Sequence, residues 1–148
     1  MGDRSNIVVQ DREERVYLYG HWMGAASIEH AAHGLRSDRA VGDPSYLARI
    51  VFASMIRRDL DGETGFGIWS SLVDNDNPIL VLDASSGSVW FEDSERLRLT
   101  RVFSREEFLA LADRLPPHPR QWAGTPGPWP FGPFFAAEPG SAAGELAR

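Results

Sequence analysis

The chain has 148 residues, 43% of them hydrophobic and 24% charged, which is the composition of a single globular domain with a substantial core. Its formal net charge of −6 argues against bulk binding to nucleic-acid phosphates. The sequence contains no cysteine, which excludes disulfides, thiol nucleophiles and zinc–thiolate sites and suits a cytoplasmic location. No apolar run approaches the ~18–20 residues of a transmembrane helix, so no interaction with a membrane is expected.

The N-terminal elements are predicted to be two strands followed by a helix. Residues 6–10 and 15–22 are rich in β-branched and aromatic side chains, and a charged turn at 11–14 separates them. Because this turn is short, the two strands should pair antiparallel. The next apolar residues have the i, i+3, i+4, i+7 spacing of a helix: Ile28, Ala31, Ala32 and Leu35.

A second helix has the clearest start in the sequence. Asp43 is a good N-cap, and Pro44 occupies the first helical position, where its missing N–H costs nothing. Apolar side chains lie almost all round residues 46–56, which predicts a largely buried helix. A last helix begins with the capping box of Ser104 and Glu107. Its predicted buried face consists of Phe108, Leu111, Ala112 and Leu115.

Between the second and the last helix, four strands are predicted at residues 66–73, 78–83, 89–91 and 97–103. Short polar turns between consecutive strands indicate antiparallel pairing. The element order ββαα-ββββ-α therefore predicts an α+β fold. In this fold, two to three helices cover one face of a single antiparallel sheet of about five to six strands.

The composition changes after Leu115, because eight of the ten prolines lie between Pro116 and Pro139. We therefore divide the chain into an α+β domain at 1–115 and an irregular, proline-, glycine- and aromatic-rich tail at 116–148. Four aromatic residues of this tail are predicted to bind an apolar groove: Trp129, Phe131, Phe134 and Phe135. The groove belongs to the same domain, to a second copy in a homodimer formed through the tail, or to another protein. The alternative is a flexible tail whose aromatic residues have no binding role.

The end of the second strand carries a first group of candidate site residues. Alternation along the strand places Tyr17, Tyr19 and His21 on one face of the sheet. Aromatic rings can stack on a planar ligand, and His21 can donate, accept or shuttle a proton. The alternative is an ordinary sheet surface with a hydrogen-bonded histidine.

The loop at residues 58–65 carries a second group. The guanidinium of Arg58 suits a phosphate or carboxylate ligand; alternatively it pairs with Asp61 or Glu63 in a plain helix-to-strand connection. Glycines in both segments allow the backbone to approach a ligand closely. We expect the two segments to lie together and to bind a small polar ligand through Tyr19, His21, Trp22, Arg58 and Thr64.

A small hydrolase or transferase is the alternative function. His21 would act as general base, with Asp61 or Glu63 as an acid or metal ligand. The run from Asp59 to Thr64 resembles the Asp-x-Asp-Gly-Thr motif of haloacid dehalogenase-type phosphotransferases, but Glu63 interrupts it. The sequence has no Walker loop, no dinucleotide fingerprint and no serine elbow, so neither loop completes a catalytic motif.

Two histidines on the first helix, His30 and His33, have a spacing compatible with two metal ligands. No strong third ligand accompanies them, so we expect them to lie on a solvated helix face. With no cysteine and no complete histidine–carboxylate set, the sequence predicts no cofactor and no tightly bound transition metal.

Four segments carry a family resemblance: Val-Tyr-Leu-Tyr-Gly-His-Trp at 16–22, Tyr-Leu-Ala-Arg-Ile-Val-Phe at 46–52, Asp-Leu-Asp-Gly-Glu-Thr-Gly-Phe-Gly-Ile at 59–68 and Asn-Pro-Ile-Leu-Val-Leu-Asp at 77–83. Together they resemble a family of small uncharacterised proteins of actinobacterial genomes, phages and other mobile elements. The resemblance covers residues 5–92 only, and Met23 stands where a second small residue is expected. It implies a phage- or mobile-element-type accessory role and supplies no catalytic residues.

These observations favour binding over catalysis. We expect a non-catalytic binding module that holds a small polar ligand, such as a nucleotide, or a protein partner. Aromatic side chains, one arginine and backbone amides are sufficient chemistry for that function.

Overall fold

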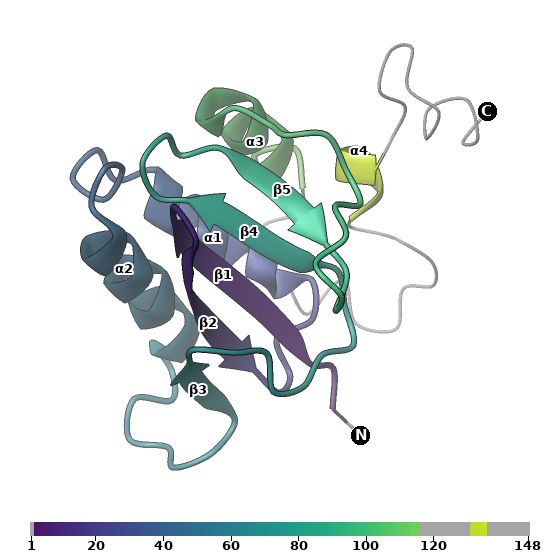
Figure 1. Cartoon of the computed structure of the whole chain (residues 1–148). Helices are drawn as coiled ribbons and strands as arrows, with labels where there is room; N and C mark the ends of the chain where they lie inside the picture. Colours follow the sequence, from purple (N-terminus) through teal and green to yellow (C-terminus); the bar gives the residue numbers. More distant parts are fainter. Residues whose placement is uncertain (1, 116–130, 136–148) are drawn as a thin grey trace.

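The structure, a computed structural model, describes residues 2–115 and 131–135. The fold is α+β, with one mixed five-stranded sheet and, within the described residues, four helices (Figure 1). The strands lie in the order β3-β2-β1-β4-β5. Their bounds are β1 Ser5–Asp11, β2 Glu14–Gly20, β3 Phe66–Trp69, β4 Ile79–Asp83 and β5 Val89–Glu92. The helices are α1 Ala26–Leu35, α2 Pro44–Ile56, α3 Arg105–Ala112 and α4 Gly132–Phe135.

One strand pairing is parallel, which corrects the prediction of a purely antiparallel sheet. β4 runs parallel to β1, with Ile7 opposite Leu80 and Val9 opposite Leu82. The other three neighbouring pairs, β1–β2, β2–β3 and β4–β5, are antiparallel. The prediction failed at residues 70–78, because this segment is a crossing connection and not a hairpin turn, so β3 and β4 are not neighbours (Figure 1).

The segment predicted as a strand at 97–103 is not a continuous strand. It joins β5 only through two isolated antiparallel bridges, Val89–Phe103 and Glu92–Arg98. Between them the ladder is interrupted, because the hydroxyl of Thr100 accepts the N–H of Phe91 at 3.2 Å in place of a backbone carbonyl. β3 also ends four residues earlier than predicted, at Trp69.

The predicted helix starts are confirmed. Asp43 caps α2 by accepting the N–H groups of Ser45 and Tyr46 at 3.0 and 3.1 Å. The capping box of Ser104 and Glu107 begins α3. These hydrogen bonds satisfy N–H groups that the first helical turn leaves without partners.

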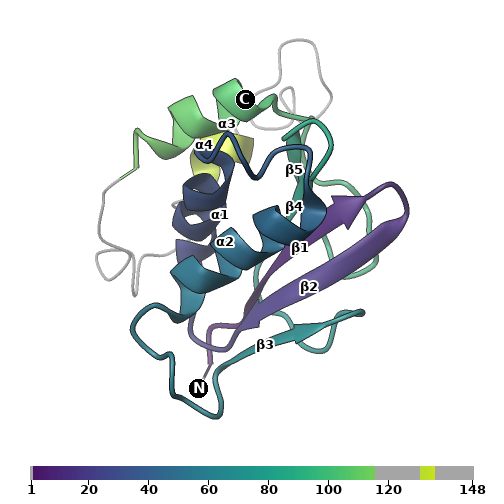
Figure 2. The ribbon, with the colours of Figure 1, turned by 90° about the vertical axis from the view of Figure 1, so that its left-hand side faces the viewer.

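Helices α1, α2 and α3 lie in one layer on one face of the sheet (Figure 2). The four apolar residues predicted for α1 are all buried. Gly34 allows α1 and α2 to approach closely, because a Cβ at this position would clash with Val51. The sheet contributes to the same core through Ile7, Val9, Leu18, Leu80, Leu82, Val89 and Phe91.

Part of the C-terminal region packs into this core. The rings of Phe131 and Phe134 are 5% and 2% exposed, and α4 gives the region one helical turn, which corrects the prediction that it is irregular throughout. The Phe134 ring centroid lies 5.2 Å from that of Phe108 and 5.4 Å from that of Phe91. Of the three grooves considered, these two rings therefore occupy one on their own chain, whereas Trp129 lies outside the described residues.

Candidate ligand-binding site on the uncovered sheet face

The two segments predicted to form the site adjoin each other at the backbone. The N–H of His21 donates to the carbonyl of Gly65 at 2.7 Å, continuing the β2–β3 ladder beyond the strand ends. The Trp22 ring lies beside Gly65 and is 68% exposed. The strand end and the beginning of β3 therefore do lie together.

The polar side chains of the 58–65 loop do not turn toward His21. Arg58, Asp61, Glu63 and Thr64 are all exposed. Among the described residues, none of these side chains forms a hydrogen bond or an ion pair, either with His21 or with one another. The loop projects away from the sheet (Figure 1), so neither the ligand-binding arrangement nor the expected Arg58 pair is assembled by contacts here.

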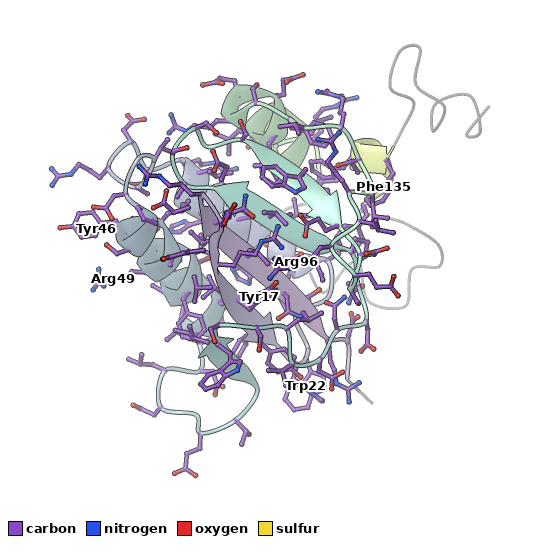
Figure 3. The ribbon with its side chains drawn as sticks, in the orientation of Figure 1. Tyr17, Trp22, Tyr46, Arg49, Arg96 and Phe135 are labelled. Atoms are coloured by element: carbon purple, nitrogen blue, oxygen red, sulfur yellow. The ribbon has the colours of Figure 1, made fainter. Side chains whose placement is uncertain are left out.

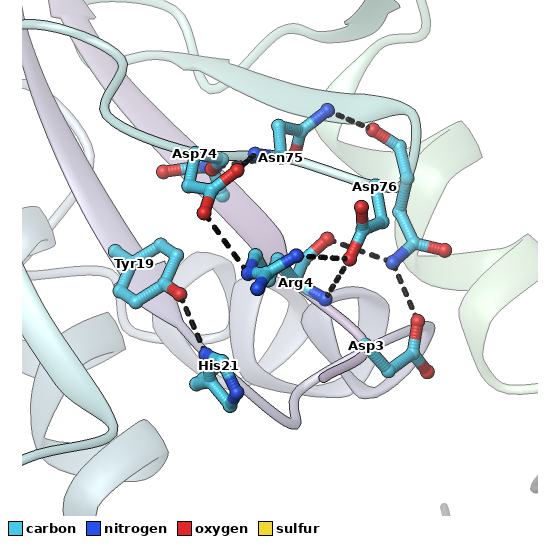
Figure 4. A network of polar contacts seen from close by, with 9 residues as sticks. Asp3, Arg4, Tyr19, His21, Asp74, Asn75 and Asp76 are labelled. Atoms are coloured by element: carbon cyan, nitrogen blue, oxygen red, sulfur yellow. Dashed lines mark hydrogen bonds and ion pairs between the residues drawn. The ribbon is translucent and has the colours of Figure 1, made fainter. Parts of the chain in front are cut away.

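His21 is held by neighbouring residues at the strand end. Its Nδ1 lies 2.9 Å from the hydroxyl of Tyr19 (Figure 4). The centroid of its ring lies 4.4 Å from that of Trp22, and the two rings meet edge-on. The ring also packs closely against Gly2, where even a Cβ would be too near. These contacts give His21 the surroundings of a structural histidine.

Arg4 joins this end of the sheet to the crossing segment, residues 70–78. Its guanidinium lies 3.0 Å from Asp74 and 3.5 Å from Asp76, and its backbone N–H donates to Asp76 (Figure 4). Asn77 donates to the carbonyl of Arg4 and to the carboxylate of Asp3, both at 2.8 Å. Residues 70–78 are thereby held across the sheet.

His30 differs from the sequence expectation of a solvated face. Its Nδ1 lies 2.8 Å from the hydroxyl of Ser54 on α2, so the side chain bridges the two helices. Burial, with smaller contributions from the charges of His33 and Arg57, lowers the pKa of His30 to about 4. The described residues contain no group of three or more histidine and carboxylate side chains arranged to hold a metal ion.

The face of the sheet opposite the helices carries a second, smaller apolar cluster. It consists of Val8, Tyr17, Ile79 and Val81, with Leu72 and Trp90 packed against it. Leu72 comes from the crossing segment and Trp90 from β5. The cover is partial, since Trp69, which lies opposite Tyr17 on the same face, remains 62% exposed.

A buried ion pair spans this face from β2 to β5. The Arg15 guanidinium donates to both oxygens of Glu92 at 2.7 and 2.8 Å, and its Nε donates to Gln10 at 2.7 Å. Trp90 Nε1 donates to Glu92 at 2.9 Å. The two charged side chains are only 8% and 6% exposed. Such a bidentate pair fixes both groups in one geometry.

The electrostatics of the pair follow from these contacts. Burial raises the pKa of Glu92, but the hydrogen bonds from Arg15 and Trp90 together outweigh it and hold the pKa below its usual range. The hydrogen bond to Glu92 raises the pKa of Arg15 against the opposing effect of burial. Both groups are therefore charged at neutral pH, and their charges compensate each other.

A cavity of about 150 Å³ lies beside this ion pair. Its lining comes from β2, the crossing segment, β4, β5 and the turn after β5: Arg15, Tyr17, Ser71, Leu72, Ile79, Glu92, Asp93, Ser94 and Arg96. Figure 3 shows Tyr17 and Arg96 near each other over this face. Arg96 reaches the cavity from a turn in which its own φ is +66°.

Sequence reasoning identified only one face of β2 as relevant and missed most of this cavity. Alternation does place Arg15 on the same face as Tyr17. The missing information was the pairing of β4 with β1, which brings β5 and its turn, with Glu92 and Arg96, to the same face. No spacing within the chain reveals that long-range pairing.

Comparisons with known proteins returned no match to a family model, a curated protein or a solved structure. Within residues 2–115 and 131–135, no helix is long and apolar enough to cross a membrane.

Proposed function

We propose that the protein is a non-catalytic binding module that holds a small acidic group, a carboxylate or a phosphate, in the cavity of the uncovered sheet face. The observation that carries this proposal is an imbalance of hydrogen-bonding capacity. Most strong acceptors around the cavity are already used within the chain, whereas several donors are not.

The acceptors are occupied by internal partners. Both oxygens of Glu92 accept hydrogen bonds from Arg15, and Trp90 adds another. Oδ1 of Asp93 accepts the backbone N–H groups of Glu95 and Leu97 at 2.8 and 2.9 Å. A ligand that offers donors therefore finds few partners in the cavity.

The donors are available. In the part of the chain that the structure describes, the side chains of Ser71, Ser94 and Arg96 make no hydrogen bond or ion pair, and all three line the cavity. A guanidinium beside two hydroxyls suits an oxyanion, which accepts several charge-assisted hydrogen bonds. The fixed Arg15–Glu92 pair contributes a rigid wall and no net charge.

Size and shape limit the ligand. A cavity of about 150 Å³ corresponds to roughly five water molecules at about 30 Å³ each. That volume accommodates one phosphate or carboxylate with a short apolar portion against Leu72 and Ile79. A larger, planar ligand would extend toward the exposed ring of Trp69, where stacking is favourable.

The enzyme alternative has no comparable support. The hydrogen bonds described for His21 lead to Tyr19 and to the Gly65 and Asp3 backbones, and Asp61 and Glu63 are exposed side chains in a projecting loop. The phage- or mobile-element-type accessory role stays a prediction of the sequence resemblance.

The proposal is tested by titrating the protein with inorganic phosphate and with acetate. Backbone amide chemical shifts in NMR spectra monitor the binding. We expect shifts at residues 15–17, 71–72 and 92–96, and Arg96→Ala should weaken phosphate binding by about tenfold or more, as expected for a charge-assisted hydrogen bond. Arg49→Ala removes an exposed arginine from α2 and is the matched control. Equal losses of phosphate affinity in both variants would overturn the proposal. So would the absence of saturable chemical-shift changes at the cavity.

A further inference from the structure

Exposed apolar side chains concentrate around β3. Among the described residues, nine large hydrophobic side chains are exposed, and three of them lie on or beside this strand: Trp22, Ile68 and Trp69. Two more, Leu60 and Val73, belong to the segments that lead into and out of it. Within the described part of the chain β3 is also an edge strand, since β2 is its only neighbour there. Exposed apolar side chains on an open strand edge are a usual mark of an interaction site.

The alternation of hydrogen-bonded and non-bonded residue pairs between β2 and β3 determines which backbone groups of β3 face the free edge. In an antiparallel ladder, hydrogen-bonded pairs alternate with non-bonded pairs. The bond between His21 and Gly65 sets this alternation, so the bonded pairs along the register are Tyr19–Gly67 and Tyr17–Trp69. The N–H and C=O groups of Phe66 and Ile68 therefore point toward the free edge.

We propose that a second copy of this chain pairs with β3 in antiparallel orientation about a twofold axis at Ile68. In this register Ile68 exchanges N–H···O=C bonds with the second copy's Ile68. An axis perpendicular to the sheet places helices on the same side in both copies, so apolar side chains of the helix face meet across the junction. Two five-stranded sheets become one continuous sheet.

The side chains on the uncovered face are self-complementary in this register. Gly67 then lies opposite the second copy's Trp69, in a non-bonded pair, where side chains approach most closely. A Cβ on Gly67 would meet no atom of the described residues within 4 Å, so they leave open space above this glycine. The exposed Trp69 ring fills the space over a strand glycine, and twofold symmetry makes the same contact twice.

The available surface suits a small, reversible dimer. Trp22 is 68% exposed and Trp69 is 62% exposed. A tryptophan side chain can bury about 150–250 Å² of surface. Ile68, 53% exposed, adds apolar surface on the other face of the strand. Together with the paired backbones, these side chains form an interface smaller than the ~800 Å² per partner of a standard complex, which is the size of weak, reversible association.

Sedimentation equilibrium of the full chain across a concentration series tests the proposal. Wild type should be a reversible dimer. Ile68→Pro should be monomeric yet folded, because it removes an N–H that faces outward and not one bonded to β2. Ile68→Val keeps the N–H and the apolar contact and should remain dimeric.

Two further variants keep the test decisive. Trp69→Ser should raise the dissociation constant at least tenfold, whereas Tyr46→Ser, an exposed aromatic on α2, should not change it. A wild type that is monomeric at all concentrations would overturn the proposal. So would a dimer that survives Trp69→Ser and is lost on Phe135→Ser, which would assign the interface to the C-terminal region.

Discussion

The two edge strands of the sheet, β5 and β3, differ in whether their outward backbone groups are hydrogen-bonded. At the β5 edge, the segment 97–103 returns alongside the strand, and backbone hydrogen bonds of 2.7 to 2.9 Å join Val89 to Phe103 and Phe91 to Leu99. At the β3 edge, no described segment takes up the outward backbone groups of Phe66 and Ile68. Within residues 2–115 and 131–135, one edge is closed by the chain itself and the other is left open.

The aromatic residues follow the same division. Behind the β5 edge they are buried, with Phe91, Phe103, Phe108 and the C-terminal Phe134 packed together. Beside the β3 edge, Trp69 and Trp22 are exposed. Aromatic side chains thus stabilise the fold at one edge and supply interaction surface at the other. Substitutions at each edge test this division of roles.

The largest expected effect is at the closed edge. Phe134→Ala removes a ring buried against Phe91, Phe103 and Phe108, and should lower the free energy of unfolding by about 3–5 kcal/mol. Phe135→Ala, which removes a partly buried neighbour, should cost less. Urea denaturation of both variants measures the difference. Equal, small losses would mean that α4 contributes little to the core and that the domain ends at Leu115 as the sequence predicted.

A second large effect is expected at the ion pair on the uncovered face. Arg15→Met leaves the buried Glu92 carboxylate without its partner and should cost on the order of 3 kcal/mol at neutral pH. Arg15→Met combined with Glu92→Leu removes both charges and should recover most of that loss. The double variant separates the cost of an unpaired charge from the loss of packing, and failure to recover would assign the cost to packing.

The same pair gives a pH dependence with a defined sign. The folded-state pKa of Glu92 is lowered, so its stabilising contribution is present above the unfolded-state pKa of about 4.3 and is lost as pH falls through the folded value. In Arg15→Met the carboxyl keeps the burial that raises its pKa, so mild acid should relieve part of the destabilisation. Urea midpoints of the wild type and of Arg15→Met, measured at neutral and at mildly acidic pH, test whether acid relieves the destabilisation.

What the sequence predicted correctly is local, and what it missed is long-range. The capping residues Asp43 and Ser104 and the helical spacing around Ile28 depend on neighbours a few residues away, and all three predictions hold. The parallel pairing of β4 with β1 joins residues some seventy positions apart, such as Ile7 and Leu80. Short-range patterns carry no information about such a pairing, so the cavity that depends on it was not found.

A smaller effect is expected in the helix layer. Because the pKa of His30 is lowered to about 4, the folded protein holds this group neutral while the unfolded chain protonates near 6.5. Stability should therefore decrease as pH falls from about 6.5 to about 4, by on the order of 2 kcal/mol from this group. His30→Gln should flatten that part of the pH profile of the urea midpoint. His33→Gln, an exposed histidine of the same helix, should change the profile much less, because the charge of His33 lowers the pKa of His30 less than burial does; the reverse pattern would contradict the assignment.

The smallest expected effect distinguishes the strand end from the cavity as the binding site. Tyr19→Phe removes the hydroxyl that meets Nδ1 of His21 at 2.9 Å, and should cost about 1 kcal/mol, as one partly buried hydrogen bond does. His21→Gln should cost a similar amount, because that ring packs between Trp22 and Gly2. Neither substitution should alter phosphate binding.

Arg96→Ala should do the opposite. It should weaken phosphate binding while leaving the free energy of unfolding within about 0.5 kcal/mol, since an exposed side chain without described partners contributes little to the fold. Measuring both properties on all three variants gives two opposite patterns. If His21→Gln weakens phosphate binding and leaves stability intact, the ligand binds at the strand end that the sequence predicted, and the cavity on the uncovered face is not the site.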